Sequence, residues 1–144
     1  MTFAELLTQV TARLKLPAVA PPADARNMEI TLEGGTTISL SLLADNATVS
    51  VAAMLWFYPE AAKLPAMFET LLAANAYGYA TRGASFAVDQ RNSKVFLFRN
   101  FSLDGLDLDA FIPALRDFLT VHRIWSEAYD NGKFWALAAD AQAA

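Results

Sequence analysis

Apolar residues near the start of the chain recur at steps of three and four, the spacing of one face of an α-helix. This face consists of Phe3, Leu6, Leu7, Val10 and Leu14. Thr2 and Glu5 have the spacing of a capping box, in which each side chain satisfies a backbone N–H at the helix start. Pro17 disfavours helical geometry at Leu16, so the helix should end before this proline.

Strict alternation of apolar and polar residues follows an extended connector at residues 18–25. Residues 27–32 and 37–42 both alternate, which predicts two half-buried β-strands. Gly34 and Gly35 lie between these runs and can supply the positive φ angles of a tight turn. The pattern predicts a β-hairpin.

A third strand, expected over residues 48–58, is apolar on both faces in its second half. Met54 and Trp56 lie on one face there, and Leu55 and Phe57 lie on the other. Antiparallel sheets usually leave one face to water, so we expect something to cover this part of the strand.

The second half of the chain predicts a helix, two strands and a long helix. The second helix should begin near Pro65 and end at Gly78, and the strands should span residues 84–89 and 94–101. The last helix should begin near Asp107 and bury a stripe of Phe111, Leu115, Phe118, His122 and Trp125. Pro113 predicts an irregular first turn or a kink in this helix. We expect one domain over residues 1–144, with a loosely ordered tail at 132–144.

Composition excludes several classes of function. Eleven Lys and Arg against fifteen Asp and Glu leave a net charge of −4, which disfavours binding to nucleic acid. The absence of cysteine excludes disulfides and thiolate chemistry. No apolar run is long enough for a membrane span, and no secretory signal is apparent, so we expect a soluble cytoplasmic protein without membrane insertion. Apolar residues form 55% of the chain, a surplus that can coat an interface as well as a core.

Candidate chemistry is sparse. His122 is the single histidine, and its place on an apolar stripe favours a partly buried, hydrogen-bonded side chain over a ligand or catalyst. Asp104, Asp107 and Asp109 form an acidic cluster, but a calcium loop starting at Asp104 would need an acid where Leu115 stands. Capping and loop solvation explain these residues better. The chain has no phosphate-binding or nucleophile motif, so we expect no catalytic, cofactor or metal site and a protein that is not an enzyme.

The predicted order and several short motifs are similar to those of a known family. The motifs are Leu71-Leu72-Ala73-Ala74-Asn75, Thr81-Arg82-Gly83-Ala84, Ala87-Val88-Asp89, Val95-Phe96-Leu97 and Leu103-Asp104-Gly105-Leu106-Asp107, followed by Phe111, Leu115, Phe118 and Trp125. With them, the chain resembles the class I type III secretion chaperones, the Tir chaperone (CesT) family, from Met1 to about Tyr129. The resemblance implies an α+β fold in the order α-β-β-β-α-β-β-α, with a twisted antiparallel sheet packed against helices.

The resemblance also implies a function and two surfaces. Members of this family are homodimers that bind an extended N-terminal segment of a secreted effector and keep it soluble and competent for export, without a cofactor. By resemblance, effector binding falls on Phe3, Leu7, Val10, Ile38, Leu40, Met54 and Trp56. The dimer interface falls on Leu71, Leu72, Asn75, Phe86 and Val88. For each residue taken singly, an ordinary place in the core remains an alternative.

A second function hypothesis is a regulator or scaffold of the same fold that binds another protein without export. A third, a small enzyme, would need a polar pocket with several titratable groups. The gene next to this one, or a protein that co-purifies with the chain, would discriminate between export and regulation.

Overall fold

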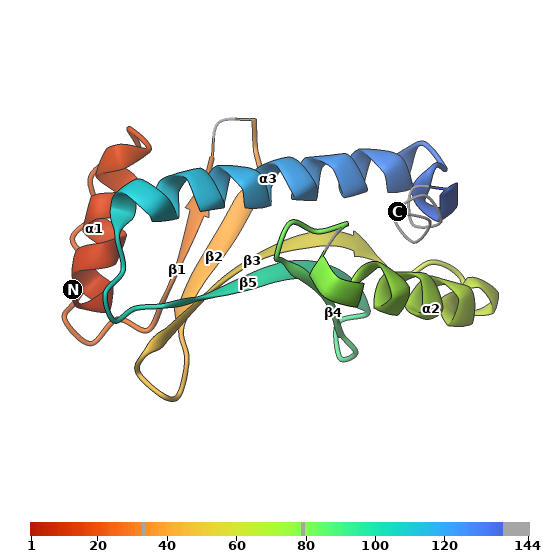
Figure 1. Cartoon of the computed structure of the whole chain (residues 1–144), viewed down its shortest axis with the longest axis horizontal. Coiled ribbons are helices and arrows are strands. Elements are labelled where there is room, and N and C mark those ends of the chain that lie inside the picture. The colour runs from red at the N-terminus through yellow and green to blue at the C-terminus, as the bar shows by residue number, and fades with distance from the viewer. Residues whose placement is uncertain (33, 79, 137–144) are drawn as a thin grey trace. The chain divides into compact units, whose positions relative to one another are not determined.

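The computed structural model describes residues 1–32, 34–78 and 80–136. Its elements, in chain order, are α1 (Phe3–Arg13), β1 (Asn27–Thr31), β2 (Thr37–Leu42), β3 (Thr48–Phe57), η1 (Ala61–Lys63), α2 (Leu64–Ala74), η2 (Ala76–Gly78), β4 (Ser85–Asp89), β5 (Lys94–Ser102) and α3 (Leu108–Asp130). Apart from the two short 3₁₀ turns η1 and η2, this is the predicted order of helices and strands (Figure 1).

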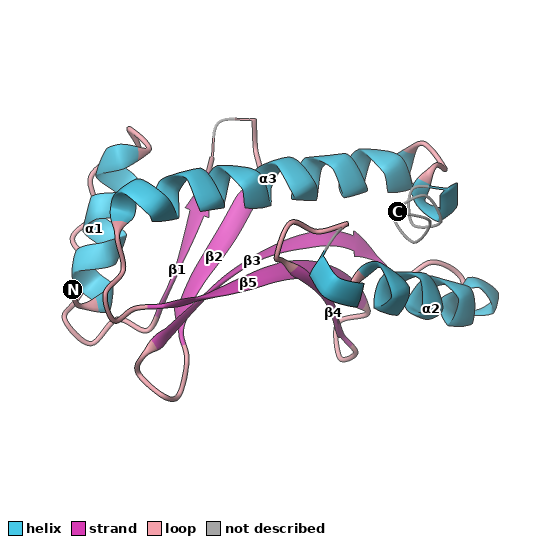
Figure 2. Ribbon diagram, viewed as in Figure 1, coloured by secondary structure: helices cyan, strands magenta, loops and turns pink. Residues whose placement is uncertain are grey.

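The five strands form one sheet in the order β1-β2-β3-β5-β4 (Figure 2). The hairpins β1–β2 and β4–β5 are antiparallel, and so is the pair β2–β3. Ile30 pairs with Ile38 in the first hairpin and Phe86 pairs with Leu97 in the second. In this order β1 and β4 are the edge strands, so each presents one backbone edge that no strand of the described chain covers.

The predicted start of α1 is confirmed. The Thr2 hydroxyl accepts a hydrogen bond from the Glu5 N–H at 3.1 Å, and the Glu5 carboxylate accepts one from the Thr2 N–H at 2.9 Å. Both bonds satisfy donors that the first turn of a helix leaves free. The helix ends at Arg13 and Lys15 takes a φ of +57°, so the helix stops before Pro17 as expected.

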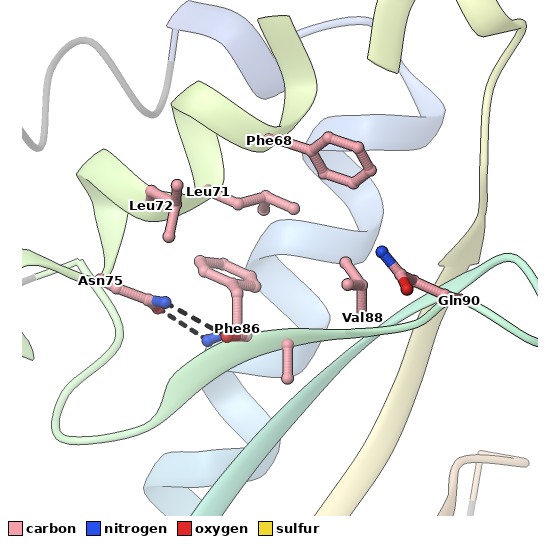
Figure 3. A pocket seen from close by; sticks show the side chains of 8 residues that line it. Phe68, Leu71, Leu72, Asn75, Phe86, Val88 and Gln90 are labelled. Atoms are coloured by element: carbon pink, nitrogen blue, oxygen red, sulfur yellow. Dashed lines mark hydrogen bonds between the residues drawn. The ribbon is translucent and has the colours of Figure 1, made fainter. Parts of the chain in front are cut away.

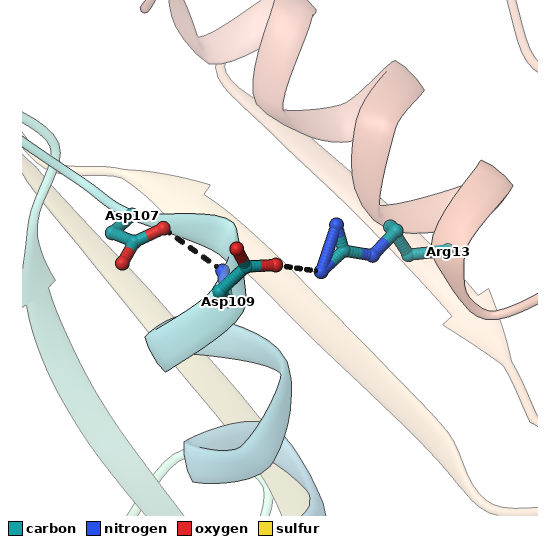
Figure 4. A network of polar contacts seen from close by, with 3 residues as sticks. All are labelled: Arg13, Asp107 and Asp109. Atoms are coloured by element: carbon teal, nitrogen blue, oxygen red, sulfur yellow. Dashed lines mark hydrogen bonds and ion pairs between the residues drawn. The ribbon is translucent and has the colours of Figure 1, made fainter.

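Residue contacts divide the chain into two compact units. The first unit comprises residues 1–53 and 100–116. Its buried apolar side chains come from α1, β1, β2, β3, the start of α3 and the loop before it: Phe3, Leu6, Leu7, Val10, Ile30, Ile38, Leu40, Val49, Val51, Ala53, Leu103, Phe111, Ile112 and Leu115. In this unit Arg13, the last residue of α1, forms an ion pair with Asp109 in the first turn of α3 (Figure 4). Asp107 accepts a hydrogen bond from the Asp109 N–H at 3.0 Å, which confirms its capping role.

The second unit comprises residues 54–99 and those from 117 onward, and aromatic rings dominate its core. The rings of Trp56 and Tyr129 stack with their centroids 4.1 Å apart, and Phe134 meets Trp56 edge-on at 5.1 Å. The indole N–H of Trp56 points at the sulfur of Met67, 3.5 Å away. Phe134 is fully buried, so the prediction of a loose tail is wrong at this residue. Residues 137–144 of that predicted tail lie outside the described residues.

Helix α3 is continuous from Leu108 to Asp130 with Pro113 inside it. The irregular turn or kink expected at Pro113 does not interrupt the helix. Pro113 lacks the N–H that would bond to the carbonyl of Asp109, and Asp109 is exposed, so water can satisfy that carbonyl. The position close to the helix start therefore lowers the cost of the proline.

Strand β3 changes its buried face along its length. Val49, Val51 and Ala53 are buried, but beyond them Trp56 is the buried residue, while Met54 and Phe57 are exposed. The Met54 carbonyl accepts a hydrogen bond from Nε2 of His122 on α3, with 2.6 Å between the two atoms. His122 is thus half-buried and hydrogen-bonded, as predicted, and the two-faced apolar pattern corresponds to a change in which side is covered.

Replacing Trp56 with Ala should lower the free energy of unfolding by about 3–5 kcal/mol, because it removes the ring that Tyr129 and Phe134 contact. Urea unfolding followed by circular dichroism measures this loss. Phe57→Ala is the matched control, since its side chain is 64% exposed and should cost much less. Equal losses for the two variants would contradict a core role for Trp56.

Candidate functional site

The strongest candidate for a binding surface is an apolar groove of about 260 Å³ in the second unit. Helix α2 forms one wall and strand β4 forms the other (Figure 3). We call it the α2–β4 groove; its lining residues are Phe68, Leu71, Leu72, Asn75, Phe86, Ala87, Val88 and Gln90. The five residues predicted for a dimer interface, Leu71, Leu72, Asn75, Phe86 and Val88, all line this groove. The structure brings them together, and their role in a dimer stays a prediction.

The side chains of α2 divide between the core and the groove mouth. Pro65 lies in the first turn, where its missing N–H costs no helical bond. Leu71 is buried, whereas the next residue, Leu72, is 72% exposed. Val88 on the opposite wall is 37% exposed. Large apolar side chains with this exposure, on both sides of a groove, are typical of surfaces that bind another protein.

Asn75 closes one position of the free β4 edge. Its side-chain carbonyl accepts a hydrogen bond from the Phe86 N–H at 2.7 Å, and its amide N–H donates to the Phe86 carbonyl at 3.2 Å (Figure 3). The amide therefore pairs with Phe86 as a neighbouring strand would. Bonding directions alternate along a strand, so the backbone of Val88 points toward the same edge.

The chemistry of the α2–β4 groove suits binding and offers no catalytic set. Asn75 and Gln90 are its polar lining residues, and neither titrates. No group of three or more His, Asp or Glu side chains in the described part of the chain could hold a metal ion. The resolved pKa shifts belong to residues that do not line the groove: hydrogen bonds from the Thr48 hydroxyl and the Asn92 side chain lower the pKa of Asp45 and of Asp89, respectively, and burial raises the pKa of Tyr129.

The residues predicted for effector binding lie mostly inside the two units. Phe3, Leu7, Val10, Ile38 and Leu40 are buried in the first unit, and Trp56 is buried in the second. Met54, also in the second unit, is exposed. Sequence periodicity identified apolar faces correctly, but it cannot tell whether a face is covered by the same chain or open to a partner. Binding by these residues stays a prediction.

A second hollow, of about 420 Å³, lies beside edge strand β1 in the first unit. It is lined by Leu7, Pro21, Pro22, Asp24, Ala25, Arg26, Asn27 and Met28. Sequence reasoning identified the proline-rich connector but not this hollow. Arg26 anchors the connector, because its guanidinium donates to the Asn46 side chain and the Leu43 carbonyl, each at 2.8 Å. The one sequence signal for this hollow is the cluster of prolines, because prolines restrict the backbone and favour an extended connector that can form one of its walls.

The model of the Tir chaperone protein (CesT) family matches residues 5–126 of the chain. The chain belongs to this family. A search of curated protein sequences gives no match. No helix in the described residues of this CesT-family chain is both long and apolar enough to cross a membrane.

Solved structures share the fold of this CesT-family protein. A chain of the ExsC–ExsE complex is 19% identical, with a TM-score of 0.69 over 88% of this chain and 96% of that one. A chain of the HopA1–SchA chaperone–effector complex is 15% identical, with a TM-score of 0.66 over 86% and 92%. A chain of the ExoU–SpcU complex from the type III secretion system of Pseudomonas aeruginosa is 15% identical, with a TM-score of 0.60 over 91% and 96%. They confirm the predicted α+β fold.

Replacing Asn75 with Ala should lower the free energy of unfolding by about 1–3 kcal/mol, because the Phe86 N–H and carbonyl lose their partner. Hydrogen exchange at the Phe86 amide, measured by NMR, should become faster in the same variant. Glu69→Ala, an exposed change on the same helix, should leave both quantities nearly unchanged. An unaltered exchange rate at Phe86 would contradict the pairing of Asn75 with the β4 edge.

Proposed function

We propose that this protein is a type III secretion chaperone that binds the N-terminal segment of an effector and keeps it soluble and competent for export. The single observation that carries the proposal is the family match over residues 5–126. We further propose that it acts in the bacterial cytoplasm and binds without catalytic turnover. The uncharged, apolar lining of the α2–β4 groove supports a binding role.

Two features of the fold support capture of an extended segment. Strand β1 is an edge of the sheet, and an extended peptide can add a strand to such an edge through backbone hydrogen bonds. Exposed apolar side chains on the second unit, among them Met54 and Phe57, can contact the apolar side chains of the bound segment. Ordering a disordered segment costs about 2–5 kcal/mol or more, and apolar contact offsets that cost.

Among the predicted effector-binding residues, we assign direct contact to Met54. Its side chain is exposed on β3, and the neighbouring Phe57 is exposed further along the strand. We assign a supporting role to Phe3, Leu7, Val10, Ile38, Leu40 and Trp56, which are buried. These six side chains hold the helix and strands whose outer atoms a segment would meet.

We propose that two copies of the chain associate through the α2–β4 groove. Leu72 and Val88 provide exposed apolar surface on the two walls, and the groove has no charged lining residue to keep it hydrated. A second copy would cover both walls. The β4 edge next to Phe86 would lie within the covered area, which also protects it from unspecific strand pairing.

Light scattering at micromolar concentration should give a mass about twice 15.7 kDa for the wild-type chain and near 15.7 kDa for Leu72→Glu. The introduced charge would have to be buried without a partner in the dimer, so association should weaken by at least about 100-fold. Leu43→Glu, on an exposed side chain of the first unit, is the control and should remain dimeric. A monomeric wild-type chain would overturn the proposed dimer.

The export function is tested by purifying the tagged chain from the bacterium that encodes it. A larger protein should co-purify in a fixed ratio, and limited proteolysis should leave the chain bound to that protein's N-terminal segment. Met54→Glu should weaken the complex about 10-fold, whereas Leu43→Glu, with the same exposed fraction of 37%, should not.

The binding mode distinguishes export from regulation. A partner that binds through a folded domain, and stays soluble when expressed without this chain, would overturn the export function and favour the regulator hypothesis. A partner that aggregates or is degraded when expressed alone would support the chaperone role.

A further inference from the structure

Helix α3 ends in a turn that directs the chain back onto the helix. Gly132 has a φ of +80°, a conformation that glycine adopts without strain. The N–H of Gly132 donates to the carbonyl of Tyr129 at 3.2 Å, and the N–H of Lys133 donates to that of Ala128 at 2.7 Å. These two bonds define a Schellman motif. Phe134 follows at once and is therefore directed toward the last turns of α3.

Phe134 fills a site built from three aromatic rings, which we call the aromatic box: Trp56, Trp125 and Tyr129. Its ring centroid lies 5.1 Å from that of Trp56, 5.7 Å from that of Tyr129 and 5.9 Å from that of Trp125. All three contacts are edge-on, the geometry that aromatic quadrupoles favour. Phe134 is 1% exposed. It occupies the box as a ligand side chain would.

The aromatic box and its occupant come from different parts of the chain. Trp56 and Trp125 lie within the residues that the family model matches, whereas Tyr129 and Phe134 follow residue 126, where the match ends. The matched part of the chain thus builds two walls of the box. A segment outside the match supplies the ring that fills it.

The surroundings of the aromatic box are apolar and exposed. Met54 lies on the same face of β3 as Trp56, two residues away, and its side chain is 37% exposed. Trp135, which follows Phe134, is also exposed and contacts the Phe134 ring at 4.5 Å. An extended segment that binds at Met54 would therefore pass beside Trp56, a wall of the box.

We propose that the aromatic box is the binding site for an aromatic or large aliphatic side chain of the partner's extended segment, and that Phe134 is a tethered substitute for it. The proposal rests on the proposed function, because the partner is the segment that the chaperone binds. A tethered group competes at a high effective concentration. The apparent affinity for a partner is the affinity of the open box multiplied by the fraction of chains in which the box is open. Phe134 therefore favours segments that place an aromatic or large aliphatic side chain at the box.

The site itself is tested without any partner. Phe134→Ala empties the aromatic box and leaves its walls unchanged, so N-acetyl-phenylalanine amide at millimolar concentration should raise the melting temperature of this variant and alter its tryptophan fluorescence. The wild-type chain should show neither effect. A folded Phe134→Ala variant that ignores this probe would overturn the proposed site.

Exchange in the wild-type protein provides a second test that needs no stable variant. The Lys133 N–H closes the Schellman motif, so its hydrogen exchange reports displacement of Phe134. The Lys133 N–H should exchange by local opening, at least about 10-fold faster than the backbone N–H of Trp125 inside α3. If the Lys133 N–H exchanged only when the whole protein unfolds, the proposal that Phe134 leaves the aromatic box would be overturned.

Competition is tested with the N-terminal segment isolated from the co-purified partner. Phe134→Ala should bind that segment at least about 10-fold more tightly than the wild-type chain, while Lys133→Ala, an exposed neighbour, should bind as wild type. Equal or weaker binding by Phe134→Ala would overturn the competition and leave the chaperone function standing. If Phe134→Ala bound N-acetyl-phenylalanine amide but no protein co-purified with the chain, the proposed function would be overturned and the aromatic box would still stand as a binding site.

Discussion

Strand β3 has apolar side chains on both faces beyond Ala53, and the structure depends on how these two faces are covered. On one side, Trp56 is buried by α3 residues and by Phe134. On the other side, Phe57 stays exposed. A sheet that is apolar on both faces cannot be satisfied by helices on one face alone. The demand for further cover is a physical reason for this chain to bind another polypeptide.

Three polar side chains of the second unit satisfy backbone groups. Asn75 satisfies the Phe86 backbone on the β4 edge, His122 satisfies the Met54 carbonyl, and the Trp125 indole N–H donates to the Ala80 carbonyl at 3.0 Å. Each of these side chains bonds to backbone. These bonds fix the positions of β3, of β4 and of the chain at Ala80, so the three side chains serve the fold.

Sequence periodicity predicted the element order, the α1 capping box and the apolar faces, because each depends on neighbours a few residues apart. The family resemblance, and not periodicity, grouped Leu71, Leu72, Asn75, Phe86 and Val88, which line one groove in the structure. Whether an apolar face is open could not be predicted, because that depends on contacts between distant segments. Phe134 illustrates the limit: an Ala-rich neighbourhood suggested a loose tail, whereas Gly132 and the rings of Trp56 and Trp125 fix its position.

The α2–β4 groove and the aromatic box differ in one respect: the apolar surface of the groove is open, and that of the box is covered by a side chain of the same protein. The groove carries Leu72 and Val88 exposed, with one edge position closed by Asn75, so a permanent partner can bury it without first displacing anything. The box is already filled by Phe134, so any ligand must compete. Constant association suits an open surface, whereas reversible capture suits a filled one, because the tethered ring closes the site again when the ligand leaves. A chaperone that must release its cargo needs the second kind.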